Sequence, residues 1–315
     1  MFKIVREEAR LVNINIRDDT NSHGTDEAAK LLLREDADPN NSANEDGSTP
    51  LHVFCKRDDG DEFIRLFFES ADEKHQLVGV DAEDELGRTP LQWAVANLLL
   101  GAVDLLLEHG ADASSFVFPT EDYFDANFDS SDCGYQYRLK RASRVLSVVE
   151  RLEKGGYEPD RDAVLTIMKF LAKHGLFEMS AKLHGRSRYL VKLLQEDEAF
   201  ANMARELTIE PSLTFYDLIS LPTVRAKRLL TYVDCARLAS SNKWFELSMN
   251  HILACLGYLC ETMLGKFCQR WFLDSFAELT RHRLPIICSD IVVEQLSNED
   301  VFNICLAVSD RNYEY

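Results

Sequence analysis

Hydrophobic residues recur every three or four positions along most of the chain, which is the spacing of one face of an α-helix. The pattern is clearest over residues 145–152 and 164–171. No stretch alternates hydrophobic and polar residues over the length that a β-strand series requires. Further helices are predicted over residues 189–207, 223–238, 245–264 and 268–280, with breaks at Pro211, Pro222 and Pro285. The hydrophobic pattern therefore predicts an all-α protein.

A short motif near the N-terminus occurs twice. The segment Asp46–His52 (DGSTPLH) returns as Glu85–Gln92 (ELGRTPLQ), and an apolar helical stretch follows each copy. In each copy a glycine permits the left-handed backbone of a tight turn, a threonine hydroxyl can cap a helix, and a proline suits the first helical position. The residues concerned are Gly47, Thr49, Pro50, Leu51 and His52 in the first copy and Gly87, Thr89, Pro90 and Leu91 in the second.

A second repeated marker lies at a matching distance from the first. Leu105–Asp112 (LLLEHGAD) echoes Leu31–Asp38 (LLLREDAD), and Leu66-Phe67-Phe68 stands between them. Self-similarity at such a period is typical of repeat proteins, in which each unit buries its apolar face against its neighbours. The markers predict three helical units stacked side by side.

Together these markers resemble the ankyrin repeat. Residues 89–112 reproduce its T-P-L-H entry, its paired helices and its G-A-D exit, with Gly110 and Asp112 at the exit. The resemblance implies a short solenoid over residues 1–113, with about three units of which the first is partial or degenerate. Leu98-Leu99 depart from the family's usual Gly-His. His52 stands where ankyrin histidines join turn hydrogen bonds, so a structural role is favoured over a catalytic one.

Two segments interrupt the repeat pattern. Between Phe68 and Thr89 lie about seven residues more than the ankyrin period needs, so Glu69–Glu85 is predicted to be an acidic surface loop, either tolerated slack or a contact for a partner. Residues 114–137 mix aromatic and acidic residues without a period. They are predicted to form a boundary whose aromatic residues cover the last repeat, because a terminal repeat has no neighbour. Residues 138–315 form the predicted helical C-terminal region.

That region ends in a predicted helical hairpin over residues 283–308. Ile287, Ile291 and Leu296 lie near one face of its first helix, and Ser297 or Asn298 can cap the second helix. The apolar stripe then continues through Val301, Ile304, Cys305 and Val308.

The hairpin resembles the F-box-like core of the PRANC domain, which accompanies ankyrin repeats in poxvirus proteins, in Wolbachia and in Hymenoptera such as parasitoid wasps. Residues 213–219 and 270–285 also look like the longer insect and Wolbachia members. The resemblance implies an adaptor: the hairpin docks the Skp-type adaptor, and with it the cullin, of an SCF ubiquitin ligase, while the ankyrin surface binds a client protein. The implied docking residues are Leu284, Pro285, Ile287, Ile291, Leu296 and Ile304.

A second interpretation of the hairpin stays open. Ile287 occupies the position at which a standard F-box usually has Glu after its Leu-Pro pair. A hairpin that only completes the core explains the same apolar positions, and the chain would then be an ankyrin scaffold or an inhibitor of a signalling protein. Docking needs an exposed apolar patch over residues 284–304. The alternative places these side chains against Trp271, Phe276 and Leu279.

Composition narrows the class of protein. The chain has 315 residues, 46% of them hydrophobic, and 53 acidic against 35 basic residues, for a net charge of −18. This charge repels nucleic acids and anionic membranes, so neither is a predicted partner. No apolar run is long enough for a signal peptide or for a membrane span of about 20 residues. The eight scattered cysteines form no C-x-x-C pair, which indicates reduced thiols in the cytoplasm or nucleus.

Candidate catalytic chemistry is sparse. The phosphate-binding glycine loop, G-x-S-x-G and H-E-x-x-H are all missing from the sequence. The acidic residues Asp58, Asp59, Asp61 and Glu62 lack calcium-loop spacing and are expected to be solvated. His251 and Cys255 lie one helical turn apart, but no third group orients them, so packing is favoured over a Cys-His nucleophile pair. The sequence predicts no enzyme, no cofactor and no metal.

Overall fold

The computed structural model describes residues 38–40, 46–57, 59–118, 134–181 and 187–311. The chain forms two compact units, one of residues 1–128 with 148–158 and the other of residues 129–147 with 159–315. The structure is mostly helical, which confirms the predicted all-α class. None of the described helices combines the length and apolarity needed to cross a membrane.

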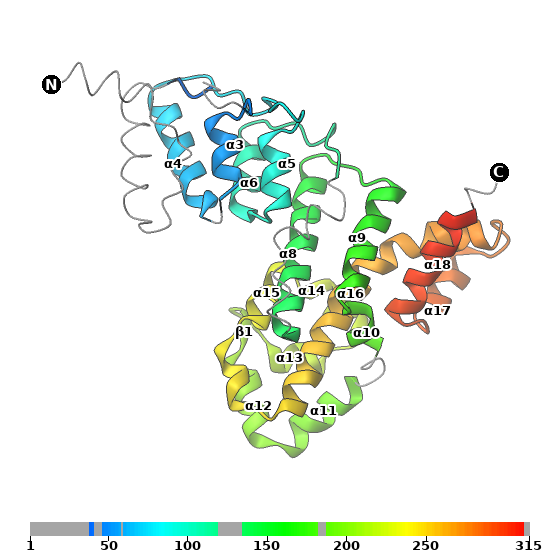
Figure 1. The fold of residues 1–315 in the computed structure, drawn as a ribbon. Coiled ribbons are helices and arrows are strands. Elements are labelled where there is room, and N and C mark those ends of the chain that lie inside the picture. Colours follow the sequence, from blue (N-terminus) through cyan, green and yellow to red (C-terminus); the bar gives the residue numbers. More distant parts are fainter. Residues whose placement is uncertain (1–37, 41–45, 58, 119–133, 182–186, 312–315) are drawn as a thin grey trace. The chain divides into compact units, whose positions relative to one another are not determined.

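The first unit contains two described helix pairs (Figure 1). Within each pair the two helices pack together, and the pairs stack through their first helices and through their second helices. The shared interior is apolar and includes Leu51, Ile64, Phe67, Leu91 and Leu106, all 1% exposed or less. The helices are α3 (Pro50–Cys55), α4 (Gly60–Glu73), α5 (Pro90–Ala96) and α6 (Leu100–Glu108).

Helices α3 and α5 begin in the same way. Each has an N-cap threonine, Thr49 or Thr89, followed by proline at the first helical turn. The glycines two positions before these threonines both have φ of +68°, a left-handed conformation that glycine adopts without a steric penalty. Each repeated motif is therefore a turn followed directly by a helix start.

A residue with a left-handed backbone (positive φ) follows each of the helices α4, α5 and α6, and only one of these three residues is glycine. Gly110 follows α6 with φ of +92°, whereas His75 after α4 and Leu98 after α5 have φ of +53° and +54°. Leu98 stands where ankyrin repeats usually have glycine, yet the backbone keeps the left-handed turn. Its side chain is 1% exposed, so burial of the leucine offsets the steric cost of that conformation.

The acidic insertion is only partly a loop. The predicted loop began at Glu69, but α4 continues to Glu73 and has 14 residues against nine in α6. Five of the extra residues therefore lengthen a helix, and only the remainder extend the following turn. Phe67, Phe68 and Ala71 are buried on the apolar face of α4, which explains why the helix persists through the acidic sequence.

The boundary between the units also differs from the predicted ranges. Helix α8 (Tyr135–Lys154) begins before residue 138, and residues 148–158 belong to the first unit rather than to the C-terminal region. Phe116 packs edge-to-face on Tyr157, with ring centroids 5.4 Å apart. A Cβ at Gly155 would lie 2.9 Å from Leu107, so glycine permits the close approach to the last repeat. Residues 119–133 of the predicted boundary lie outside the described residues.

The second unit is built around one long helix, α16 (Met249–Leu279), against which α10, α14, α17 and α18 pack. Phe272, Leu259 and Leu264 of α16 are completely buried. The other elements are α9 (Arg161–Lys173), α10 (Leu176–Ala181), α11 (Ser187–Glu196), α12 (Glu198–Glu206), β1 (Thr208–Glu210), β2 (Leu213–Thr214), α13 (Phe215–Ser220), α14 (Thr223–Leu229), α15 (Tyr232–Ala239), the 3-10 helix η1 (Asn242–Glu246), α17 (Ile286–Val293) and α18 (Asn298–Arg311).

Several predicted helix limits in this unit were wrong. The helix predicted over 189–207 is two helices, because Asp197 caps a new start by accepting from the Phe200 N–H at 2.9 Å. The helix predicted over 223–238 also divides, with Thr231 capping α15. Conversely, α16 runs unbroken where two helices were predicted. The short β1–β2 ribbon was not predicted.

Candidate protein-binding surfaces

Two aspartates organise the repeat turns. Asp46 accepts hydrogen bonds from the N–H and Oγ of Ser48, and Asp84 accepts from the N–H groups of Leu86 and Arg88, both at 3.0 Å. Partial burial alone would raise the pKa of each carboxyl. For Asp46, hydrogen bonds from Lys56 and Ser48 outweigh burial and lower the pKa to about 2. The turns are thus held by charged acceptors that stay ionised at neutral pH.

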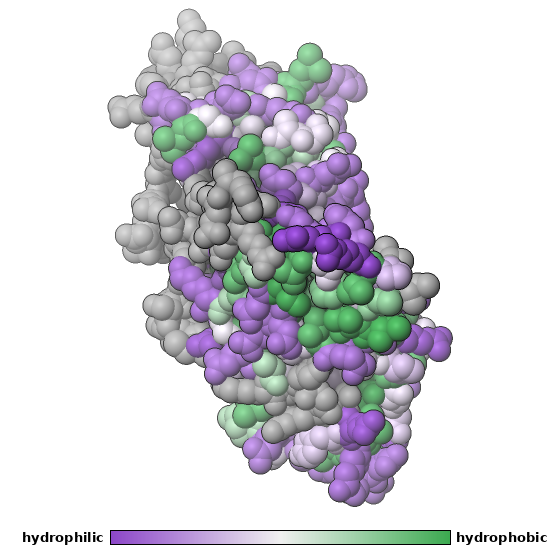
Figure 2. Space-filling model, turned by 90° about the vertical axis from the view of Figure 1, so that its right-hand side faces the viewer, coloured by the Kyte–Doolittle hydropathy of each residue, from purple (hydrophilic) through white to green (hydrophobic). Residues whose placement is uncertain are grey.

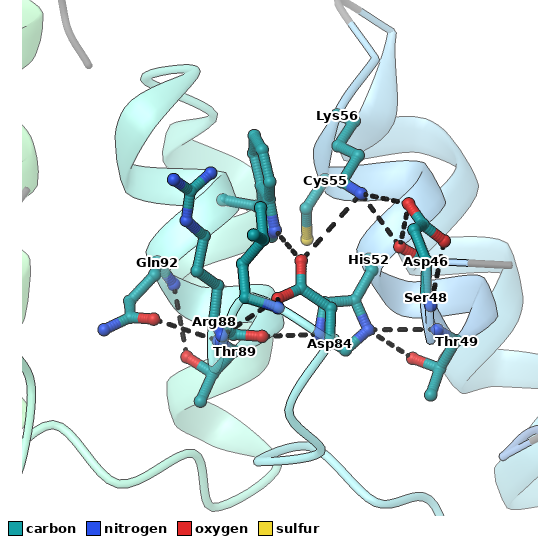
Figure 3. Close-up of polar contacts among 12 residues, drawn as sticks. Asp46, Ser48, Thr49, His52, Cys55, Lys56, Asp84, Arg88, Thr89 and Gln92 are labelled. Carbon is teal, nitrogen blue, oxygen red and sulfur yellow. Dashed lines mark hydrogen bonds and ion pairs between the residues drawn. The ribbon is translucent and has the colours of Figure 1, made fainter. Parts of the chain in front are cut away.

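His52 joins one turn to the next (Figure 3). The Thr49 N–H donates to His52 Nδ1 at 3.1 Å, so Nδ1 is unprotonated and Nε2 carries the proton. Nε2 lies 2.9 Å from the Arg88 carbonyl oxygen, to which it donates. Burial lowers the pKa of this imidazole, which favours the neutral form that the contact with Thr49 requires. His52 therefore has an inter-repeat structural role in this geometry.

The second threonine cap is similar. Thr89 N–H donates to Gln92 Oε1 at 3.0 Å, and Gln92 N–H donates to Thr89 Oγ1 at 3.3 Å. At the exit of the last repeat, Asp112 accepts from the N–H of Ser114 at 2.9 Å. The ankyrin signature residues in the described part of the chain thus lie in turns and at helix starts, and two of them, Leu51 and Leu91, are buried in the first turns of α3 and α5.

Trp93, in the first turn of α5, is a candidate contact residue beside the repeat turns. Its Nε1–H donates to Asp84 Oδ2 at 2.9 Å, and its ring is half-buried. Lys56 Nζ lies 4.5 Å and the Arg88 guanidinium 4.9 Å from the ring centroid. We call Lys56, Arg88 and Trp93 the Trp93 cluster; Leu86, in the neighbouring turn, is exposed. Tryptophan and arginine dominate the binding energy of many protein interfaces.

The sequence did not single out the Trp93 cluster. A signal for it was present, since Trp93 directly follows Gln92 in a motif whose other positions are buried or capping. The two cations come from different repeats, however, and sequence spacing alone did not place them on one ring.

One acidic residue proved to be structural. The sequence predicted that Asp61 is solvated, but its Oδ1 accepts from the Ala102 N–H at 2.7 Å and so caps α6 from the neighbouring repeat. A Cβ at Gly101 would lie 2.9 Å from Asp61 Cγ, so glycine leaves room for this contact. Asp59 pairs with Arg57, at 2.8 Å. No cluster of metal-ligating side chains occurs among the residues that the structure describes.

The second candidate surface lies on the C-terminal hairpin. Figure 2 turns the right-hand side of Figure 1, with α17 and α18, toward the viewer and shows hydrophobic side chains gathered there. Leu284 is 45% and Ile291 60% exposed, and Pro285 is exposed too. We call these three residues the α17 face. Arg281, His282 and Arg283, directly before it, are exposed as well.

The predicted docking residues do not all share this exposure. Leu296 and Ile304 are only half-buried, as are Trp271, Phe276 and Leu279 of α16, and the side chain of Ile287 lies outside the described residues. Of the six predicted docking residues, Leu284, Pro285 and Ile291 are therefore the ones that the structure shows exposed.

The opposite side of the hairpin is part of the core. Val293, Val301, Cys305 and Val308 are buried, and Phe302 stacks on Phe177 of α10 at 4.8 Å. Ser297 and Asp300 cap α18 reciprocally. Asn298 is buried and donates to Ser180 Oγ at 2.9 Å and to the Glu261 carbonyl oxygen at 3.1 Å. Both helices pack against α16, which holds the hairpin in one place.

His251 and Cys255, which lie one helical turn apart, lack the features of an activated thiol pair. Cys255 is fully buried, and burial raises its pKa far above the usual value of a thiol. His251 lies 3.9 Å from the Asp197 carboxylate and beside the ring of Phe200. The same burial keeps Cys55, Cys235, Cys260 and Cys268 protonated.

Comparison with protein families identifies the repeats. Residues 20–116 match the family model of ankyrin repeats, in three copies. This confirms three ankyrin units at the N-terminus, although the first one lies mostly outside the described residues. No curated protein and no solved structure matches the chain significantly. Ankyrin repeats indicate a role in protein–protein interaction.

Proposed function

We propose that the chain is a non-catalytic adaptor that binds a client protein through its ankyrin repeats and recruits the Skp-type adaptor of an SCF ubiquitin ligase through the α17 face. Recruitment of the ligase is supported by the exposure of Leu284 and Ile291 on a hairpin whose other side is packed into the unit. An apolar side chain held in water by a fixed helix costs free energy that a partner can recover.

The client site in this proposal is the Trp93 cluster with Leu86. The hydrogen bond to Asp84 and the two flanking cations fix the ring, so little conformational entropy is lost when a partner covers it. We expect Trp93→Ala to weaken client binding by at least tenfold, about 1.4 kcal/mol or more. Leu77→Ala, which changes an exposed leucine in the loop after α4, is the control variant. Client binding by each variant is compared with client binding by the wild-type full chain.

The ligase half is tested with purified Skp-type adaptor and cullin. The full chain is expected to capture both, and the double variant Leu284→Asp, Ile291→Asp is expected to lose at least tenfold in affinity, about 1.4 kcal/mol. Leu296 is left unchanged, because it is half-buried and a charge there threatens the fold. The matched control is Phe245→Asp, a charge placed on a side chain 79% exposed on η1.

A second candidate function is an ankyrin scaffold or inhibitor without ligase recruitment. The burial of Val293, Val301, Cys305 and Val308 favours it, since these contacts explain much of the hairpin as a stabilising block. If the correctly folded wild-type chain binds its client but does not capture the Skp-type adaptor, the scaffold or inhibitor function is the one supported.

A further inference from the structure

Helix α14 (Thr223–Leu229, labelled in Figure 1) presents an unusual outward face. Val224 is 52% and Leu229 40% exposed, and Arg225 and Arg228 are exposed with them. Val224 and Arg228 are four residues apart, as are Arg225 and Leu229, so the two pairs form neighbouring strips on one side of the helix. We call these four residues the α14 face.

The inward side of α14 is firmly packed. Ala226 is completely buried, and Leu230 just beyond the helix is 2% exposed. The Lys227 stem lies so close to α16 that a Cβ at Gly265 would approach Lys227 Cε to 2.5 Å. These contacts hold the backbone of α14 in place, so the four outward residues stay on the exposed side of the helix.

The charge on this face is unbalanced. Within the part of the chain that the structure describes, neither Arg225 nor Arg228 forms an ion pair, and α14 contains no acidic residue. Elsewhere Arg57, Arg151 and Arg237 each lie within 2.8 Å of an aspartate. In a chain with a net charge of −18, two exposed arginines on one short helix without an acidic residue form a local basic site.

We propose that the α14 face binds an acidic amphipathic segment of a partner protein. Carboxylates of the segment pair with Arg225 and Arg228, and its apolar side chains cover Val224 and Leu229. Burying the apolar residues supplies affinity, while the charges steer association and select the partner. Nucleic acids and anionic membranes suit this face less, because two arginines do not offset the repulsion from a strongly acidic chain. None of its four residues belongs to the Trp93 cluster or to the α17 face.

The test uses an unbiased display library of helical peptides and the full chain. The library is first depleted on the variant Arg225→Glu, Arg228→Glu and then selected on the wild type. We expect the recovered peptides to combine acidic and apolar residues. Their affinity should fall at least tenfold in the charge variant and in Val224→Ser, Leu229→Ser, and should weaken as salt is raised.

The matched control is Arg188→Glu, Tyr189→Ser on α11, which changes an exposed arginine and an exposed aromatic residue outside α14. Circular dichroism and thermal melting of every variant establish that the helices are intact. Recovery of no peptide above background, of peptides without acidic residues, or of peptides that bind the two α14 variants as well as the wild type would overturn the proposal. Binding of the wild type to phosphatidylserine vesicles through Arg225 and Arg228 would overturn it in favour of a membrane surface.

Discussion

Different kinds of contact stabilise the interior of each of the two units. In the ankyrin unit, polar residues at repeated positions set the geometry: Asp46 and Asp84 hold the turns, and His52 bonds across to the next turn. In the C-terminal unit, apolar side chains from many helices pack irregularly around α16. The contacts of Asp46 and Asp84 within their turns join near neighbours in the sequence, so the motifs that form them can be recognised there. Irregular packing joins residues that are distant in the sequence, so it cannot be recognised there.

The largest expected effect tests the packing of the C-terminal unit. Trp244 is completely buried on η1 and donates to the Leu238 carbonyl oxygen at 2.6 Å, whereas its neighbour Phe245 is 79% exposed. We expect Trp244→Ala to lower the free energy of unfolding by about 3–5 kcal/mol, because it creates a cavity and removes the indole hydrogen bond to the Leu238 carbonyl oxygen. Urea denaturation with hydrogen–deuterium exchange measures the loss and assigns it to a unit.

Phe245→Ala is the matched control, and its expected change is below about 0.5 kcal/mol. Faster exchange in the C-terminal helices with unchanged protection in α3–α6 would show that the units are independent. Equal loss of protection in both units would contradict the distinction drawn between them.

The second-largest expected effect comes from removing Asp84, one of the polar side chains that hold the repeat turns. Asp84→Ala deprives the N–H groups of Leu86 and Arg88 and the Trp93 indole of one shared acceptor. We expect a loss of about 2–3 kcal/mol from the ankyrin unit, because one buried charged acceptor of three hydrogen bonds is removed. Thermal melting followed by hydrogen exchange in α3–α6 measures it. Asp46→Ala should cost less, since the Asp46 side chain is 56% exposed, and equal losses would argue against the shared-acceptor explanation.

A smaller effect appears with pH. The pKa of His52 is lowered in the folded state, so below the ordinary value of 6.5 the unfolded chain binds more protons and the ankyrin unit loses stability as pH falls. His52→Gln recreates the Thr89 and Gln92 cap without a titrating group. At pH 7.5 we expect it to cost about 1 kcal/mol, the bond to Arg88.

Between pH 6.5 and 5 the same variant should flatten the decline in stability relative to the wild type, as measured by urea midpoints. An identical decline in both proteins would mean that His52 is not the group responsible.

The smallest effect concerns the helix ends. His75 has φ of +53° and is exposed, so its side chain gains little from the structure and strains the backbone. His75→Gly should raise the ankyrin unit's stability by about 0.5–1 kcal/mol, and Gly110→Ala should lower it by a similar amount. Melting temperatures measure both changes. A loss of stability in His75→Gly would point to a contact of that side chain.

Much of the fold was predictable where the signal was local. The T-P-L motifs, their glycines and the L-L-L markers predicted the ankyrin units, and the hydrophobic period predicted an all-α chain. The continuity of α16 was not predictable from the sequence, because a glycine such as Gly265 is typical of a helix end. In the structure that glycine accommodates the Lys227 stem, a contact between residues far apart in the sequence.

The candidate surfaces divide in the same way. The sequence alone placed Leu284, Pro285 and Ile291 in an apolar hairpin, and it determined the turns that carry Leu86 and Arg88. Only the tertiary structure decided that Ile291 is exposed while Val293 is buried, and that Lys56 and Arg88 lie over Trp93. The physical reason is that turn and helix-start chemistry involves neighbours in the chain, whereas exposure depends on which distant helix covers each side chain.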